Sequence, residues 1–219
     1  MLEGFKINCY PLNRTIRVSI HLPMDYNQTR RFYPVIYLFD GQNLYNKQEA
    51  YSEEIIDLEK TIEKLKNDGK EAIYVGIAAA SNPEKRDLEY SDIELAKFIS
   101  SSIHPFLKVR YRMNNYIYSC GWGKASLNAL ALNQEESFKG AVILSPEGMD
   151  DDFLKLKLEP NNLYYIYSGE KELNGKCLAL ANKLKEIIPN SQFVTDDGAI
   201  HSESVWQEKI YSALSYLIL

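Results

Sequence analysis

Cysteine and histidine are both scarce in this sequence. Cys9, Cys120 and Cys177 are the only cysteines, and no two of them have the Cys-x-x-Cys spacing of a zinc site. Three scattered cysteines are also too few for a disulfide framework. The first residues of the chain lack the basic and then apolar layout of a signal peptide. We therefore expect reduced thiols in a cytoplasmic protein, with no metal and no dissociable cofactor.

Long apolar runs and runs of like charge are missing as well. No apolar stretch approaches the roughly 20 residues that cross a bilayer, so we expect no membrane association. The 25 lysine and arginine residues are outnumbered by 30 aspartate and glutamate residues, which gives a net charge of −5. This acidic balance argues against nucleic acid as a partner, because binding to a polyanion needs a basic surface.

Apolar residues, in contrast, are plentiful enough for a core, at 45% of the chain. Strand-like and helix-like segments alternate, which predicts a mostly parallel twisted sheet with helices on both faces. No repeat, low-complexity segment or linker interrupts this pattern, so we expect residues 1–219 to form a single domain. Strands are predicted at residues 4–10, 15–23, 33–41, 71–79, 115–120, 140–146, 163–169 and 191–195, and helices at 52–66, 91–109, 124–132, 174–187 and 203–219.

The first three predicted strands follow one another without a helix, so that end of the sheet is expected to be antiparallel. In the rest of the sheet, functional residues are expected just after the strands, because ligands bind at the carboxyl ends of parallel strands. The segments that follow the third to the eighth strand are 40–45, 80–90, 119–124, 145–147, 169–172 and 198–203.

Five fragments in this order resemble the putative esterase family of α/β-hydrolases, the group with the esterase D-like, S-formylglutathione hydrolase-like and siderophore esterase-like enzymes. The fragments are RVSIHLPMDY at 17–26, YPVIYLFDGQN at 33–43, RDLEY at 86–90, FKGA with the later LSP at 138–146, and GAIHSESVW at 198–206. The resemblance implies an α/β-hydrolase fold of about eight strands without a large lid. It also implies carboxylic-ester hydrolysis by acyl transfer to a serine.

The resemblance assigns roles to individual residues. His201 corresponds to the histidine that deprotonates the nucleophile, and Glu172 to the acid that orients it, with Glu170 as the competing choice. The backbone N–H groups of Gln42 and Trp122 correspond to the oxyanion hole. The substrate pocket that the family implies is lined by Gly41, Asn43, Arg86 and Tyr90.

The nucleophilic serine is absent from the matching position. Counted back from the following strand without a gap, the pattern G-x-S-x-G falls on residues 119–123, followed by Lys124, and Gly121 occupies the nucleophile position. Glycine has no side chain that attacks an ester, so we expect weak or absent hydrolysis and a pocket kept for a small acyl or carboxylate ligand. An active carboxylesterase stays open as an alternative, with Ser119, Cys120 or a water activated by His201 as the nucleophile.

A third alternative is a non-enzymatic interaction scaffold whose pocket has collapsed around Trp122. The 16 tyrosines fit either an aromatic cleft or an interface between copies of the chain. A homo-oligomer is therefore also left open.

Overall fold

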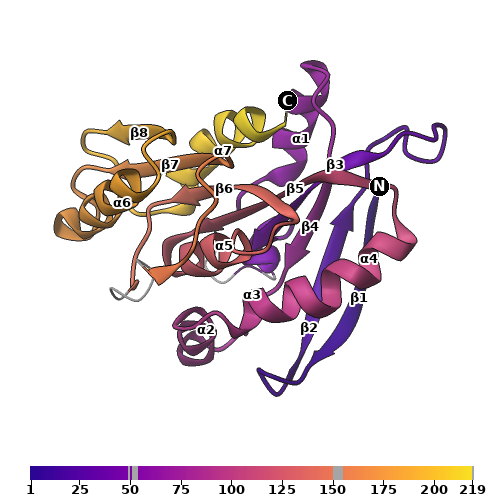
Figure 1. The fold of residues 1–219 in the computed structure, drawn as a ribbon, viewed down its shortest axis with the longest axis horizontal. Helices are drawn as coiled ribbons and strands as arrows, with labels where there is room; N and C mark the ends of the chain where they lie inside the picture. The colour runs from indigo at the N-terminus through magenta and orange to yellow at the C-terminus, as the bar shows by residue number, and fades with distance from the viewer. Residues whose placement is uncertain (49, 51–53, 150–154, 219) are drawn as a thin grey trace.

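The computed structural model describes residues 1–48, 50, 54–149 and 155–218, and is built around one sheet of eight strands. The strand order is β1-β2-β4-β3-β5-β6-β7-β8 (Figure 1). The strands are β1 (Leu2–Cys9), β2 (Arg14–His21), β3 (Tyr33–Phe39), β4 (Ile73–Ile77), β5 (Met113–Trp122), β6 (Phe138–Leu144), β7 (Leu163–Gly169) and β8 (Gln192–Asp196). The predicted α/β architecture with a mostly parallel sheet is confirmed, because every pairing from β4 to β8 is parallel.

The antiparallel end of the sheet contains two strands rather than three. β1 pairs antiparallel with β2, and β2 with β4. β3, which was expected at this end, lies between β4 and β5 and is parallel to both. Its sequence explains this place, because a nearly continuous apolar run suits a strand that is buried on both faces.

Helices cover both faces of the sheet. They are α1 (Leu58–Asn67), α2 (Pro83–Tyr90), α3 (Glu94–Phe98), α4 (His104–Arg110), α5 (Ser126–Leu132), α6 (Lys176–Ile187) and α7 (Glu203–Leu217), with shorter turns η1 (Gly41–Asn43), η2 (Ile99–Ile103), η3 (Gly123–Ala125) and η5 (Glu172–Gly175). Apolar residues of α3 to α6 pack on one face, and those of α1 and α7 pack on the other (Figure 1). No helix in the described ranges is both long and apolar enough to cross a bilayer.

One helix begins later than predicted, and another was not predicted. α1 begins at Leu58, where Asp57 caps the helix by accepting a hydrogen bond from the Lys60 backbone N–H, whereas the predicted start at Ser52 lies outside the described residues. The segment 86–90, expected in a loop, belongs to α2, which Asn82 caps and Pro83 opens. The predicted end of the last helix at Leu219 is also outside the described residues.

Alternate residues of β5 point to opposite faces of the sheet, so neighbouring residues pack against different helices. Cys120 and Trp122 point into the layer formed with α1 and α7. Ser119 and Gly121 point toward α5, since the Ser119 hydroxyl donates to the Ala129 carbonyl oxygen. The side chains from Ile117 to Trp122 in β5 are therefore buried in the core up to the end of the strand.

Gly140 in β6 illustrates how tightly the centre of the sheet is packed. A Cβ at this position would lie 2.1 Å from the carbonyl oxygen of Leu163 in β7. Because the backbone of a central strand cannot move aside cheaply, Gly140→Ala is expected to lower the free energy of unfolding by about 2–3 kcal/mol. Urea denaturation followed by circular dichroism measures this.

The matched control for this prediction is Gly69→Ala. Gly69 has a φ of +74°, but no atom lies within 4 Å of a Cβ built there. Only the left-handed backbone opposes this change, so we expect a loss of about 1 kcal/mol. Equal losses at the two positions would contradict the steric argument.

Candidate active site

The sharp turn from β5 into the following helix lies at Gly123. This residue has a φ of +54°, in the left-handed region that glycine adopts without a steric penalty. A Cβ at position 123 would lie 3.5 Å from Nε2 of His201 and 3.2 Å from Oε1 of Glu147. Position 123 is therefore the place from which a side chain would face the imidazole.

Gly121, the position expected for the turn, lies inside β5 instead. It pairs with Ile143 of β6, and a Cβ there would lie 2.6 Å from the carbonyl oxygen of Ala125. The placement of the turn at Gly121 is therefore wrong, because the segment between the turn and β6 is two residues shorter than the spacing assumed for the family. The residues Gly121 to Ala125 (GWGKA) have small residues in the two glycine places of G-x-S-x-G, and this signal points to the register that the structure adopts.

The two side chains considered as replacement nucleophiles are buried in β5 and cannot act as such. The Ser119 hydroxyl donates to the Ala129 carbonyl oxygen over 2.7 Å and accepts from Asn133 Nδ2 over 3.0 Å. Cys120 is fully buried on the other face, and its burial raises the pKa of its thiol. Neither group lies at the turn, so both alternatives are wrong.

Trp122 likewise belongs to the core rather than to an open pocket. Its side chain is fully buried against Trp206, with ring centroids 6.3 Å apart, in the layer of α1 and α7. The residue that follows the turn is Lys124. In the nucleophile turn of serine hydrolases the residue after the nucleophile provides an oxyanion N–H, and Lys124, not Trp122, occupies the matching place after Gly123.

His201 lies beside the turn, in the loop between β8 and α7. Its Nε2 is 3.8 Å from Oε1 of Glu147, and its Nδ1 is 3.8 Å from Oε2 of Glu172. The ring packs edge-on against Trp206 at a centroid distance of 4.9 Å, and the indole N–H of Trp206 donates to the Ser145 hydroxyl over 2.9 Å. One imidazole nitrogen thus faces the turn and the other faces a carboxylate, the arrangement that a general base needs.

Glu172, and not Glu170, lies against the imidazole. The Glu172 side chain is fully buried at the start of η5, and no N–H or O–H group of the described residues donates to either of its oxygens. Glu170 is exposed at the surface, and its backbone N–H pairs with the Asp196 carbonyl oxygen over 3.0 Å. Only Glu172 is therefore placed to orient His201.

Glu147 is a member of the site that the sequence did not reveal. Ser145, with a φ of +49°, reverses the chain after β6, and the Glu147 backbone N–H donates to the Gly123 carbonyl oxygen over 3.4 Å. The carboxylate is thereby held beside position 123 and His201. The residue lies in a segment where functional groups were expected, but nothing in the letters SPE indicates which way the side chain points.

The loop after β3 is held by a buried charged network. Asp40 is fully buried and accepts hydrogen bonds from Arg86 Nε and Nη2, at 2.9 and 2.6 Å, and from Tyr90 Oη at 3.2 Å. Burial and the Asp40 carboxylate raise the pKa of Tyr90, so its hydroxyl stays protonated and able to donate. Arg86 and Tyr90, expected in the substrate pocket, therefore bind the residue that precedes Gly41.

Gly41, Gln42 and Asn43 form η1 at the same edge of the sheet. A Cβ on Gly41 would lie 2.6 Å from the carbonyl carbon of Gly76, so glycine lets the loop pack directly on β4. The Gln42 side-chain amide donates to Asp40 over 3.0 Å and accepts from the Ala79 backbone N–H over 2.9 Å. Asn43 Nδ2 lies 3.5 Å from Oε1 of Glu203, which connects the loop to the start of α7.

Two cavities adjoin the turn, one on each side of Lys124. The first, of about 580 Å³, is lined by Glu147, Leu173 and Lys176 among others. The second, of about 540 Å³, is lined by Asp87, Leu88 and Tyr90 among others. A larger cavity of about 670 Å³ lies beside Gln42, over the beginnings of β2 and α2, and neither Glu147 nor His201 lines it. We assign the first cavity to the site because it contains Glu147, which faces His201.

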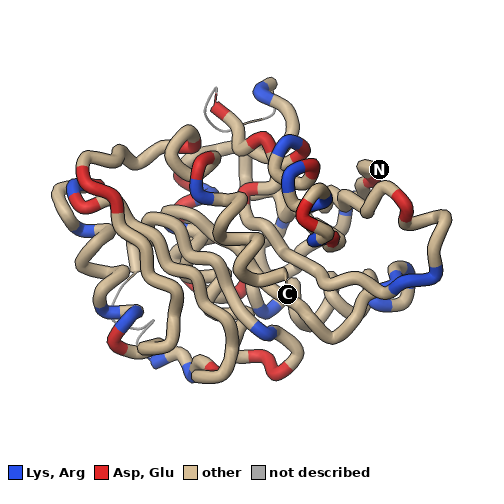
Figure 2. The backbone as a smooth tube through the Cα atoms, turned by 90° about the horizontal axis from the view of Figure 1, so that it is seen from above, with Lys and Arg blue, Asp and Glu red and all other residues tan. Residues whose placement is uncertain are grey.

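Lysine, arginine, aspartate and glutamate are mixed along the backbone in the view of Figure 2. With the two signs interspersed in this way, the charge near His201 depends mainly on the side chains that contact it. Lys124 is paired with Asp87 at 2.5 Å, while Glu147 and Glu172 flank the imidazole. The surroundings of His201 are consequently negative.

Comparison with known proteins identifies the family. The family model described as "Putative esterase" matches residues 10–147. The chain belongs to this esterase family. It is thus an esterase-type hydrolase by descent, and the match ends at Glu147, before the segments that contain Glu172 and His201. No curated protein matches the chain.

Solved structures support the same fold. A ferulic acid esterase is 17% identical, with a TM-score of 0.77 over 100% of this chain and 98% of that one. The BES protein from Bacillus cereus is 16% identical, with a TM-score of 0.77 over 100% of this chain and 95% of that one. The enterobactin esterase from Shigella flexneri, solved in the presence of enterobactin, is 18% identical with a TM-score of 0.81, and covers 99% of this chain. This chain spans only 58% of that enzyme. These likenesses confirm the α/β-hydrolase fold.

Proposed function

We propose that this esterase-family protein has lost the covalent step of ester hydrolysis and keeps a site for a neutral acyl compound. The supporting observation is the glycine at position 123. A Cβ there would lie 3.5 Å from His201 Nε2, the distance that suits a seryl hydroxyl hydrogen-bonded to the imidazole. Glycine supplies no oxygen at that point, so no acyl–enzyme bond forms.

The remaining groups are those that recognise an ester rather than cleave it. In serine hydrolases the imidazole takes the hydroxyl proton during attack on the carbonyl and returns it to the leaving group. Backbone N–H groups, here proposed to be those of Lys124 and Gln42, bind the carbonyl oxygen and the oxyanion that develops from it. Without the hydroxyl, these donors and the cavity of about 580 Å³ still form a binding site of ordinary size for a small molecule.

The charges beside the turn favour a neutral ester or amide over a carboxylate. Glu147 Oε1 is 3.8 Å from His201 Nε2, and Glu172 Oε2 is 3.8 Å from Nδ1. An anionic ligand at the turn would meet these like charges at short range. The ammonium group of Lys124 offers little compensation because Asp87 already pairs with it.

Glu147 also supports a second candidate function, slow hydrolysis by water. A water held by Glu147 Oε1 would pass a proton to His201 Nε2 as it attacks the carbonyl carbon, and the imidazolium would return that proton to the alkoxide as the C–O bond of the ester breaks. Such a reaction forms no acyl–enzyme, so its rate is expected to be well below that of a serine esterase.

Wild-type protein assayed with p-nitrophenyl butyrate distinguishes these functions. We expect release of p-nitrophenol at the uncatalysed rate, and an unchanged intact mass after incubation with substrate or with a fluorophosphonate. A rapid burst of p-nitrophenol or an acyl adduct would overturn the proposal. Turnover without an adduct, lost in both Glu147→Gln and His201→Ala, would replace it with the water mechanism.

Binding is measured separately with butyranilide, a neutral amide that resembles a butyrate ester. Leu173 lines the assigned cavity and is 41% exposed, so Leu173→Lys should weaken binding at least about 10-fold without unfolding the chain. The control is Leu88→Lys, which changes the other cavity. Absence of wild-type binding, or equal losses in both variants, contradicts the assigned site.

A further inference from the structure

Cys177 lies beside the acid and the imidazole of the site. Its Sγ is 3.8 Å from Nδ1 of His201, and Oε2 of Glu172 is 3.8 Å from the same nitrogen. The three atoms all lie within 4.8 Å of one another. Sulfur and nitrogen ligands of a tetrahedral zinc ion, at about 2.3 and 2.1 Å from the metal, are roughly 3.5 Å apart. The two 3.8 Å distances at His201 Nδ1 are close to this spacing, and the remaining edge, of at most 4.8 Å, would shorten when an ion binds.

The Glu172 carboxylate provides an independent indication that a ligand belongs here. Its side chain is fully buried, and within the part of the chain that the structure describes no N–H or O–H group donates to either oxygen; the Cys177 thiol is the neighbouring donor. A buried carboxylate without N–H or O–H partners is costly. The nearest imidazole nitrogen, at 3.8 Å, is beyond hydrogen-bond distance. A cation placed between the carboxylate and the imidazole would remove this cost.

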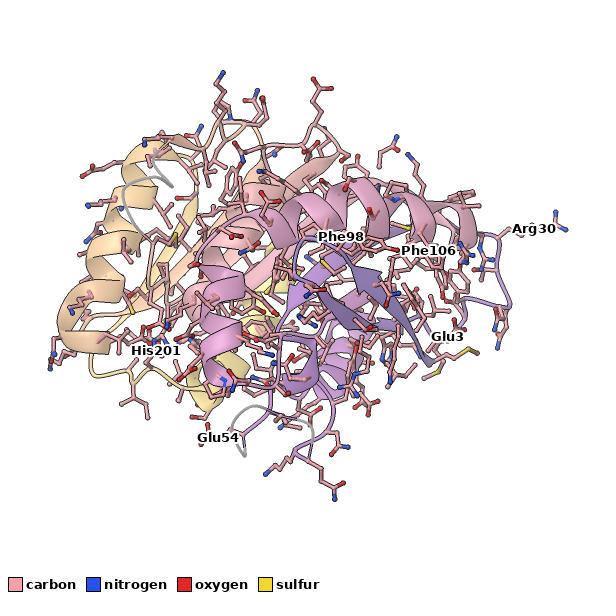
Figure 3. The ribbon with its side chains drawn as sticks, turned by 90° about the horizontal axis from the view of Figure 1, so that it is seen from below. Glu3, Arg30, Glu54, Phe98, Phe106 and His201 are labelled. Carbon is pink, nitrogen blue, oxygen red and sulfur yellow. The ribbon has the colours of Figure 1, made fainter. Side chains whose placement is uncertain are left out.

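The chain brings these residues together from three elements. Leu173, Asn174 and Gly175 have φ values of +46°, +58° and +80°, and this left-handed turn carries the chain from Glu172 to the first turn of α6, where Cys177 lies. His201 enters from the loop before α7, and in Figure 3 it lies between α6 and α7. Because 24 positions separate Cys177 from His201, no short spacing motif in the sequence reveals the cluster.

We propose that Glu172, Cys177 and His201 bind one Zn²⁺ ion, through Oε2, Sγ and Nδ1, with a water from the cleft as the fourth ligand. The donor set decides the metal, because a thiolate and an imidazole suit zinc, whereas Mg²⁺ and Ca²⁺ prefer oxygen alone. The ion replaces the thiol proton of Cys177, which is released to solvent. Thiolate and carboxylate together balance the charge of the dication.

The bound ion would leave the other imidazole nitrogen facing the turn. With Nδ1 on the metal, Nε2 is still beside position 123, and the metal rather than the nearby Glu172 carboxylate orients the ring. The proposal depends on the three ligand atoms only, and does not require any reaction at the turn. It therefore extends beyond the function proposed above.

Cobalt titration of chelator-treated wild-type protein tests the site, because Co²⁺ bound to a thiolate gives a charge-transfer absorption band. We expect one Co²⁺ per chain, a thiolate band, and displacement of the cobalt by Zn²⁺. Cys177→Ser should abolish the band and weaken Zn²⁺ binding at least about 100-fold, measured by competition with a chromophoric chelator. Cys9→Ser, which removes a buried thiol in β1, should leave both unchanged.

His201→Asn is the second test variant. The His201 side chain is 20% exposed, so its replacement should disturb folding less than replacement of the fully buried Cys177 or Glu172. It should also weaken Zn²⁺ binding. No thiolate band in the wild type, or a band that survives Cys177→Ser, overturns the proposal. Gly123 supplies no ligand, so Gly123→Ser should bind Zn²⁺ as the wild type does. The metal proposal and the acyl-transfer proposal can therefore fail separately.

Discussion

Gly123→Ser combined with Glu147→Ala is expected to hydrolyse p-nitrophenyl acetate at least about 100-fold faster than the wild type, measured as kcat/KM. A seryl Cβ would lie 3.5 Å from His201 Nε2, which brings its hydroxyl within hydrogen-bond reach of the imidazole. Glu147 is removed because its Oε1 would lie only 3.2 Å from that Cβ and would compete for the same space. The activity restored is the acyl transfer of the family.

The backbone of the turn is already suited to this nucleophile. Position 123 has a φ of +54°, so a serine there costs about 1–2 kcal/mol of stability. Serine nucleophiles of α/β-hydrolases sit on strained turns of this kind. We therefore expect a folded but less stable variant, which thermal unfolding would show.

Two controls give this result its meaning. Addition of His201→Ala should return the rate to that of the wild type, since the hydroxyl then has no base. Gly121→Ser should remain inactive and lose stability, because its Cβ would lie 2.6 Å from the Ala125 carbonyl oxygen. Activity in Gly121→Ser but not in Gly123→Ser would show that the turn has been placed wrongly.

Asp40→Ala is expected to cost about 3–5 kcal/mol of unfolding free energy, the largest loss we expect from a single substitution. The carboxylate is fully buried and binds Arg86, Tyr90 and Gln42. Its removal takes away the short ion pair to Arg86, at 2.6 Å, at a site where little solvent replaces the carboxylate, and the contact of Arg86 with the half-exposed Asp87 is longer, at 3.9 Å. Guanidinium chloride denaturation measures the loss.

Asp87→Ala is the matched control. Asp87 pairs with Lys124, but its side chain is 48% exposed, so the expected loss is at most about 1 kcal/mol. Asp40→Ala should also reduce the hydrolysis created by Gly123→Ser with Glu147→Ala, since the network holds the loop that contains Gln42. Similar stability losses in the two aspartate variants would mean that the Asp40 network does not hold this loop in place.

The placement of β3 and the start of α2 show which parts of the fold could be predicted. Buried strands such as 73–77 and 163–169 were visible as apolar runs, because burial on both faces requires them. The order of the strands could not be predicted from these runs. β3 was expected at the antiparallel end but lies between β4 and β5. The Asn-Pro pair at 82–83 is typical of a helix start, but α2, which it opens, was not among the predicted helices.

The alternation of segments by itself determined the mostly parallel α/β sheet, and the order of the resembling motifs determined the esterase family, because these depend on which residues are present and in what order. Only the tertiary structure decided that the turn lies at Gly123, that Glu147 faces His201, and that Cys177 meets Glu172 and His201. These outcomes depend on distances between residues far apart in the chain. Such distances follow from strand register and helix packing, which no local pattern encodes.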